Sequence, residues 1–268
     1  MDPSKVCLFV PPDLKKFKLN LFERIAKKVG RSVRHDYREL DSLPDDVVPI
    51  IGCTPELRPL VDRWRERGRT WIYWDRGYAR RVFATWLPRA ESIEKSYYRW
   101  HVNAFQMGRI RDVLDDRWRA LKIDVSPWSR DGRHIVVAVP TKTYTSFHRI
   151  ETWVDDTIAQ IKSYTDRPIV TRAKEELNRP LQGDLRGAHC LVTHGSNTAV
   201  ESVVYGCPVF VHPDSAASLV GETCLSRIEN PVYPDREPWL RSLAYSQFNE
   251  FELVDGTLWR LIDEGGAA

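Results

Sequence analysis

The sequence contains no long apolar run. Of its 268 residues, 42% are hydrophobic and 29% are charged, which is the balance of a soluble globular protein. No stretch approaches the roughly 18 consecutive apolar residues of a membrane-spanning helix. The opening MDPSKVCLFVPPD carries one lysine and a short apolar segment that ends at two prolines, which fits a buried strand better than a secretion signal. The sequence therefore predicts a cytoplasmic protein without a membrane span.

The sequence also lacks the usual metal-binding motifs. Its five cysteines never form a CxxC pair, and their odd number and wide spacing indicate reduced thiols. Cys7, Cys190 and Cys207 lie in or beside apolar segments, where cysteine packs as a small hydrophobic residue. There is no DxD motif, and Asp155 and Asp156 fall in a predicted helix. We therefore expect no metal site and no bound cofactor.

Charge of one sign does not dominate. The formal net charge is +3, too small to indicate a nucleic-acid-binding protein by itself. Lysine and arginine do gather in residues 15–38, and arginine gathers in residues 58–81. These stretches are either solvated helix faces or surfaces for a polyanionic acceptor or for donor phosphates.

Strands and helices alternate in the first half. Residues 5–10, 47–52 and 70–75 are short apolar runs that predict strands, and amphipathic segments at 14–29 and 55–67 predict helices between them. Such alternation is typical of parallel βαβ units in a doubly wound sheet. Residues 77–122 have weak periodicity, and we assign no element there.

The same alternation restarts after a boundary at residues 126–132. Strands are expected at 134–140, 168–170 and 190–193 and again after the G-x-P-V at 206–209. The predicted fold is α/β, with two Rossmann-like lobes that face a cleft. We expect an N-terminal acceptor lobe over residues 1–125 and a C-terminal ligand-binding lobe over residues 126–268.

The segment THGSNTAVESVVYGCPVFVHP, residues 193–213, carries the predicted chemistry. Gly195 allows a sharp turn after the strand, and Ser196, Asn197 and Thr198 are all residues that can cap the next helix. The first turn of a helix presents backbone N–H groups and the positive end of its dipole, which suit a phosphate. Glu201 could either close a capping box or accept hydrogen bonds from ribose hydroxyls.

This pattern resembles the donor-binding lobe of GT-B-type glycosyltransferases and their epimerase relatives, which bind a nucleotide-sugar. The resemblance covers roughly residues 134–215. It implies that Ser196, Asn197 and Thr198 contact the donor diphosphate and that Glu201 binds ribose. It also implies a donor-side role for basic residues after a strand and for the segment that begins at residue 212. The donor-binding residues expected on this basis are Arg172, Lys174, His194, Gly195, Ser196, Asn197, Thr198, Glu201, His212 and Ser215.

Three further segments look similar to small glycosyltransferase-like proteins of phages and prophages. They are WDRGY, YYRWHVNAF and the stretch from residue 225 to residue 259. That similarity implies a terminal helix over Trp239–Phe248 that crosses back to the first lobe. It also implies a location in the host cytoplasm. The basic, aromatic N-terminal half allows a nucleic-acid acceptor such as modified phage DNA.

Two aspartates are candidates for the catalytic base. Asp75 stands at the end of the strand TWIYW, and Asp13 follows the first strand and its two prolines. A carboxylate can take the acceptor proton in an inverting transfer. Aspartate also favours turns and helix caps, so either residue could instead have that structural role. His194 and His212 could contact phosphate or serve as structural groups.

Three functions remain open at this stage. The first is a metal-independent glycosyltransferase whose acceptor is a nucleic acid or a glycan. The second is a nucleotide-sugar epimerase or hydrolase on the same fold. The third is a non-enzymatic nucleic-acid-binding phage protein, whose binding would fall steeply with salt.

Overall fold

The computed structural model describes residues 1–10, 27, 36–79, 96–173 and 180–265. The chain groups into two compact units, and the second is contiguous in sequence. Unit 1 comprises Met1–Gln106 and Leu243–Ala268, and unit 2 comprises Met107–Ser242. These are groups of mutual contact, and the domain limits expected from the sequence, 1–125 and 126–268, stay a prediction.

Unit 1 contains a five-stranded mixed sheet in the order β1-β2-β3-β4-β9. Its strands are β1 (Val6–Leu8), β2 (Val48–Ile51), β3 (Ile72–Arg76), β4 (Tyr97–Val102) and β9 (Gln247–Asn249). The first three strands are parallel, as the sequence predicted, but β4 and β9 pair antiparallel. The doubly wound parallel sheet expected for this half is therefore only partly present.

The helices that the structure describes in unit 1 are short. They are η1 (Pro3–Lys5), α2 (Tyr37–Asp41), η2 (Pro55–Leu57), α3 (Arg58–Glu66), α11 (Glu250–Val254) and α12 (Thr257–Gly265). The core is rich in tryptophan because β3, β4 and α12 each bury one: the Trp74 and Trp100 rings stack with centroids 5.2 Å apart, and Trp259 meets Trp100 edge-on. The C-terminal segment thus belongs to the core of unit 1.

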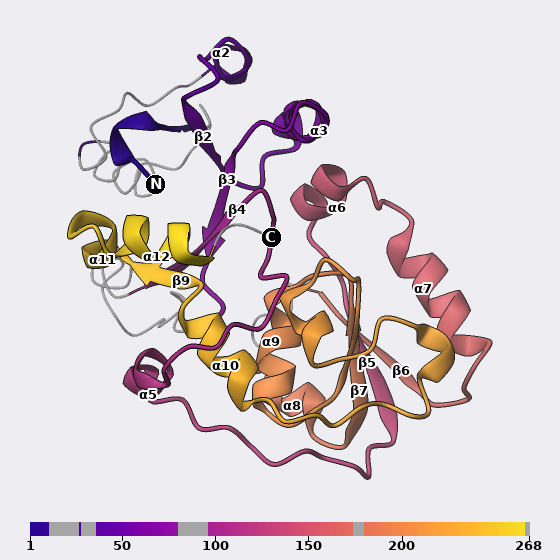
Figure 1. The fold of residues 1–268 in the computed structure, drawn as a ribbon. Helices are drawn as coiled ribbons and strands as arrows, with labels where there is room; N and C mark the ends of the chain where they lie inside the picture. Colours follow the sequence, from indigo (N-terminus) through magenta and orange to yellow (C-terminus); the bar gives the residue numbers. More distant parts are fainter. Residues whose placement is uncertain (11–26, 28–35, 80–95, 174–179, 266–268) are drawn as a thin grey trace. The chain divides into compact units, whose positions relative to one another are not determined.

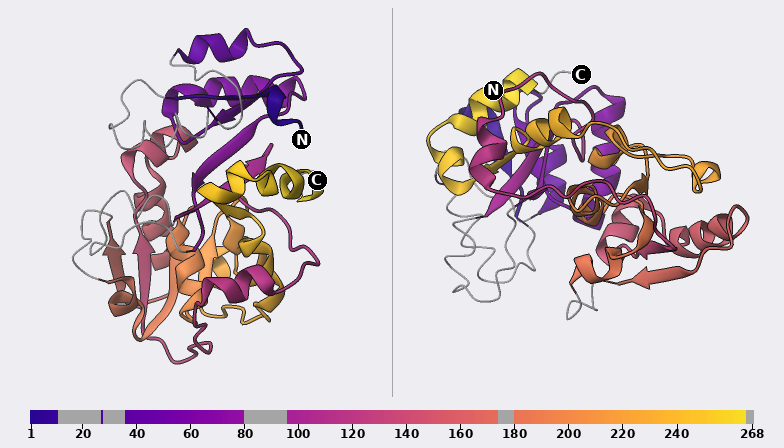
Figure 2. Two further views of the ribbon diagram at one scale, coloured as in Figure 1. Left: turned by 90° about the vertical axis from the view of Figure 1, so that its left-hand side faces the viewer. Right: turned by 90° about the horizontal axis from the view of Figure 1, so that it is seen from below.

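Unit 2 contains a four-stranded sheet in the order β6-β5-β7-β8. Its strands are β5 (His134–Ala138), β6 (Ile169–Arg172), β7 (Ala188–Thr193) and β8 (Val209–Val211), and all pair in parallel. Figure 2 shows this sheet from two further directions. The α/β prediction is confirmed here, whereas the two-lobe arrangement around a cleft stays a prediction.

Helices cover both faces of this sheet, with α7 and α9 on opposite sides (Figure 1). The helical segments of unit 2 are α5 (Asp116–Leu121), α6 (Lys142–His148), α7 (Trp153–Lys162), α8 (Leu181–Leu185), α9 (Asn197–Val204), η4 (Ala216–Leu219), η5 (Leu225–Arg227) and α10 (Glu237–Ala244). Ile161 of α7 packs with Ile135 and Val137 of β5. Burial of such apolar side chains on both faces explains why the two central strands, β5 and β7, are mostly hydrophobic.

The helix expected over Trp239–Phe248 is shorter than predicted. α10 ends at Ala244, and the chain then enters β9. Phe248 lies opposite Tyr98 of β4 and is 1% exposed. Pairing with the edge of β4 satisfies backbone groups there that a continued helix would leave open.

The buried cysteines behave as the sequence suggested. Burial raises the pKa of Cys207 to about 11 and holds the pKa of Cys190 well above its ordinary value. Both side chains are therefore neutral thiols at physiological pH, and a reactive thiolate is disfavoured at either position.

Candidate functional site

The candidate site lies at the carboxyl ends of the strands of unit 2. The chain passes from β5 to β6 on one side, but β7 lies on the other side of β5, so the strand order reverses between β5 and β7. Open α/β sheets bind ligands outside the strand ends at such a reversal. Here the hydroxyl of Thr193, the last residue of β7, donates to the carbonyl of Ala138, the last residue of β5, at 3.1 Å. The two strand ends are therefore fixed side by side.

Ser196 begins the helix after β7. Its side chain accepts a hydrogen bond from the Thr198 N–H at 3.3 Å, and its carbonyl accepts one from the Ala199 N–H at 3.0 Å. Of the three capping candidates, Ser196 is thus the N-cap and Asn197 is the first helical residue. Two of the first-turn N–H groups expected to face a phosphate are already bonded within the chain.

Glu201 is the fifth residue of α9, one turn from its start. The third helical position, from which a capping-box carboxylate reaches back, is occupied by Ala199. The capping-box alternative for Glu201 is therefore wrong, and a role in ligand binding stays a prediction.

The start of α9 offers one polar atom of particular interest. The Oγ1 atom of Thr198 is buried, and no hydrogen-bond partner for it lies in the part of the chain that the structure describes. A buried hydroxyl without a partner loses about 1–3 kcal/mol relative to a solvated one. An oxygen of a bound ligand could satisfy Thr198, as the sequence-based assignment of this residue requires.

His194 and His212 stack on each other at the same edge. Their ring centroids are 4.3 Å apart and their planes differ by 14°, and the N–H of His212 donates to the carbonyl of His194 at 3.0 Å. His194 is 6% exposed, whereas the side chain of His212 is 43% exposed. The loops after β7 and β8 thus bring together two histidines that the sequence placed 18 positions apart.

The two histidines have different electrostatic surroundings. Burial, and after it the charge of His212, lowers the pKa of His194 to about 4, while Asp214 opposes this shift. His194 is therefore a neutral imidazole at physiological pH. His212 accepts a hydrogen bond at Nδ1 from the Asp214 N–H at 3.2 Å.

The sequence analysis did not identify three aromatic side chains of this site. Tyr144 and His148, both on α6, pack with ring centroids 4.1 Å apart, and Trp153 at the start of α7 meets His194 edge-on at 6.0 Å. The Tyr144 hydroxyl lies 3.1 Å from Nδ1 of His194. The available signal was position: KTYTSFH begins two residues after Pro140, where the predicted strand ends, although it has no apolar periodicity that would predict a helix.

Two of the remaining residues predicted to bind the donor already have partners within the chain. Ser215 is buried and caps η4 by accepting the Ala217 N–H. Arg172 forms a buried ion pair with Asp184, so its charge already has a counter-ion. Lys174 lies outside the described residues.

Asp75, the first candidate for a base, lies in unit 1 at the end of β3. Its Oδ2 atom accepts from Arg99 at 3.0 Å and from the Tyr73 hydroxyl at 3.3 Å. Its side chain is 39% exposed, whereas that of Arg99 is 5% exposed. Burial lowers the pKa of the Arg99 guanidinium, but Asp75 together with Tyr73 and Tyr78 outweighs burial and raises that pKa above its ordinary value. Asp75 therefore serves at least as the counter-ion of a buried cation.

Two other neighbours of Asp75 are neutral. Burial, followed by the charge of Asp75, raises the pKa of Cys53 to about 12 and places the pKa of Tyr73 well above its usual value. Asp13, the second candidate for a base, lies outside the described residues.

Removing the charge of Asp75 should therefore destabilise unit 1. Asp75→Asn leaves the buried Arg99 without a full counter-ion, and we expect a loss of about 1–2 kcal/mol, discounted for the exposure of the carboxylate. Chemical denaturation measures this loss, and Asp62→Asn is the matched control, because its partner Arg58 is 19% exposed whereas Arg99 is 5% exposed. Equal losses in both variants would contradict the counter-ion role.

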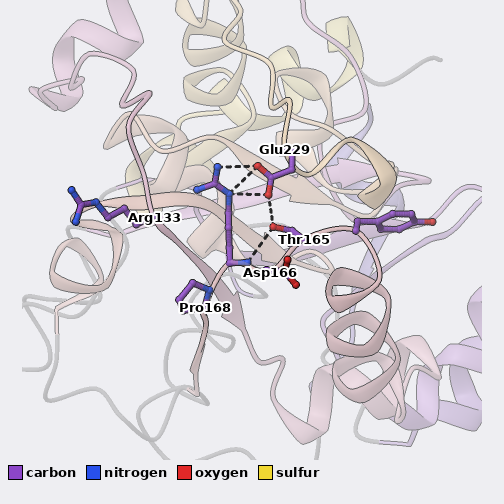
Figure 3. A pocket seen from close by; sticks show the side chains of 7 residues that line it. Arg133, Thr165, Asp166, Pro168 and Glu229 are labelled. Atoms are coloured by element: carbon purple, nitrogen blue, oxygen red, sulfur yellow. Dashed lines mark hydrogen bonds and ion pairs between the residues drawn. The ribbon is translucent and has the colours of Figure 1, made fainter.

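A separate hollow of roughly 490 Å³ lies near the amino end of β6. Arg167 donates hydrogen bonds to the Glu229 carboxylate there through Nε and Nη2. Thr165 also donates to that carboxylate, as Figure 3 shows. The lining residues are Arg133, Tyr164, Thr165, Asp166, Arg167, Pro168 and Glu229. Because Arg167 and Glu229 satisfy each other's charge, the residues that line this hollow link the start of β6 to the loop after η5.

Two types of feature are absent from the described residues. Within the described ranges, no three side chains of the His, Cys, Asp or Glu types are grouped so as to hold one metal ion. Likewise, no helix in the described part of the chain is long and apolar enough to cross a membrane.

Comparisons with known proteins identify the fold. No protein-family model and no curated protein matches the sequence. The structure is similar to Thermosulfurimonas dismutans KpsC, named a beta Kdo 2,7 transferase, with a TM-score of 0.53, 11% sequence identity and coverage of 97% of this chain and 99% of that chain. A second structure, the beta Kdo 2,4 transferase of the same organism's KpsC, has a TM-score of 0.49 and 14% identity, with 96% and 98% covered. At such low identity, the likeness to the first of these structures establishes a shared fold.

Proposed function

We propose that this protein is a glycosyltransferase that takes a sugar from a nucleotide-sugar donor. One observation carries the proposal: the loops after β5, β7 and β8 converge at the reversal of strand order, where Thr193 ties two strand ends together. The shared fold with a structure named a Kdo transferase supports this class of reaction. Fold likeness alone leaves function open, so the site itself has to be tested.

In this proposal the start of α9 receives the donor phosphates. Thr198 supplies a buried hydroxyl, the helix dipole favours negative charge, and His212 supplies a half-exposed imidazole. A positive end of a helix and nearby donors stabilise a departing diphosphate without a metal. Metal independence and the absence of a cofactor remain part of the proposal.

Donor binding can be measured by thermal shift. A ligand at about a hundredfold over its Kd adds ~2.7 kcal/mol, which raises the Tm by roughly 5–10 °C for a chain of this size. We expect a shift with one class among UDP-, GDP-, dTDP-, ADP- and CMP-sugars, and a Kdo-bearing donor belongs in the set because of the structural neighbour's name. No shift with any of them, in folded protein, would contradict the proposal and favour a binding protein.

Glu201→Ala tests the ribose assignment. The carboxylate should accept hydrogen bonds from ribose hydroxyls, and bonds to a charged acceptor contribute about 1.5–3 kcal/mol. We therefore expect donor affinity to fall roughly tenfold to a hundredfold while circular dichroism stays unchanged. Glu151→Ala, an exposed carboxylate of the same unit, is the control. Unchanged affinity in the Glu201 variant would remove this residue from the site.

The acceptor remains open between a glycan and a nucleic acid, including modified phage DNA. Release of free sugar or of an epimer from the bound donor, without any acceptor, would instead identify a hydrolase or an epimerase. Transfer of radiolabelled sugar to candidate acceptors separates these outcomes. A base in unit 1, Asp75 or Asp13, is required only for transfer by inversion.

A further inference from the structure

His194 is the centre of a cluster of rings. Four side chains from three other segments contact it: Tyr144 and His148 of α6, Trp153 of α7 and His212 of the loop after β8. With 6% of its surface exposed, the imidazole has little freedom to rotate. The orientation of this ring is therefore set by packing.

The groups that face His194 leave it uncharged. The titratable groups around it are Tyr144 and His148 on α6 and His212 and Asp214 on the loop after β8, and Trp153 carries no charge. Burial and His212 disfavour a second positive charge in this cluster. A neutral imidazole carries a single N–H, on either Nδ1 or Nε2.

The contact with Tyr144 couples the tautomer of His194 to the phenol O–H. Nδ1 lies 3.1 Å from the phenol oxygen, and a phenol O–H that donates to Nδ1 leaves the ring proton on Nε2. Nδ1 of His212, the ring stacked on His194, is also directed at the chain, because it accepts the Asp214 N–H. Both rings are thereby oriented with Nδ1 facing the chain.

We propose that Tyr144 is a positioning residue that holds His194 as the neutral tautomer with its proton on Nε2. The ring can then donate a hydrogen bond to an anionic group of the ligand, a role that rests on the proposed function. A neutral donor costs less to bury than a cation. His194 therefore recognises the ligand by hydrogen bonding, with no change in its own charge.

The tautomer can be measured directly by long-range ¹H–¹⁵N NMR of the histidine rings in the intact protein at pH 7. His194→Gln assigns the signal. We expect the wild-type signal to report a proton on Nε2, and Tyr144→Phe to shift it toward a mixture of the two tautomers. Tyr164→Phe, at a tyrosine that is 44% exposed in the same unit, should leave the signal unchanged. A wild-type proton on Nδ1, or an unchanged tautomer in Tyr144→Phe, would overturn the proposal.

A binding measurement separates this inference from the proposed function. With inorganic pyrophosphate as the probe, Tyr144→Phe should weaken binding roughly twofold to tenfold, and Tyr164→Phe should bind as the wild type does. If the tautomer responds to Tyr144→Phe but the wild type binds neither pyrophosphate nor any nucleotide-sugar, the positioning role stands and the proposed function fails. If the probe binds and the tautomer does not respond, the positioning role fails alone.

Discussion

Gly206→Ala should lower the stability of the protein by about 3–5 kcal/mol, a drop in Tm of roughly 6–20 °C. Gly206 follows α9 with a φ of +79°, and a Cβ atom there would lie 1.9 Å from the carbonyl oxygen of Pro127. The Pro127 carbonyl cannot move away easily, because hydrogen bonds fix the residues around it. The Ser126 N–H donates to the carbonyl of Val204 at 2.9 Å, and the Ser129 N–H donates to the carbonyl of Gly206 at 2.7 Å. Thermal unfolding monitored by circular dichroism measures the effect.

Gly187→Ala separates the two causes of this loss. Gly187 has a similar φ of +71°, but nothing lies within 4 Å of a Cβ atom placed there. It should lose only the roughly 1–2 kcal/mol that a left-handed backbone imposes on alanine. Equal losses in the two variants would show that the segment around Pro127 yields and that steric overlap adds nothing.

Acid should destabilise the fold through His194 by about 3 kcal/mol in total. Its folded-state pKa of about 4 lies below the ordinary value of 6.5, so the unfolded chain takes up this proton first as the pH falls. The stabilisation is complete above pH 6.5 and is lost as the pH falls toward 4, at about 1.4 kcal/mol for each unit of pKa difference. Most of it should be gone by pH 4.5.

Urea unfolding between pH 4.5 and 7 tests this expectation by difference, because other groups also titrate there. The stability of His194→Gln should fall less steeply with acid than that of the wild type. Tyr164→Phe, at a tyrosine that is 44% exposed in the same unit, is the control and should keep the wild-type slope. Parallel curves for the wild type and His194→Gln would show that this residue is protonated equally in the folded and unfolded states.

Local patterns predicted those parts of the fold that short-range physics determines. The apolar run at 134–140 became β5, and the capping residue Ser196 and the stop at Gly206 bracket α9. These features depend on burial and on hydrogen bonds within a few residues. The same reasoning found Asp75 at a strand end.

Contacts between distant residues could not be predicted in this way. β9 has three residues, and its pairing with β4 joins Phe248 to Tyr98, so nothing within the segment itself predicts a strand. Tyr144 reaches His194 across 50 positions, and the polar segment that carries it has no amphipathic period. The partner of Arg172, Asp184, likewise depends on how α8 packs.

The division of the chain also determines the order in which its parts can be completed on the ribosome. Unit 2 is an uninterrupted stretch that is fully synthesised once residue 242 has emerged, whereas the first 106 residues still lack β9 and α12. Domains fold as units while synthesis proceeds. The second unit can therefore reach its native state first, while β4 keeps an open edge and Trp100 lacks its partner Trp259. During translation, the sheet of unit 1 therefore gains its last strand only after unit 2 has been synthesised.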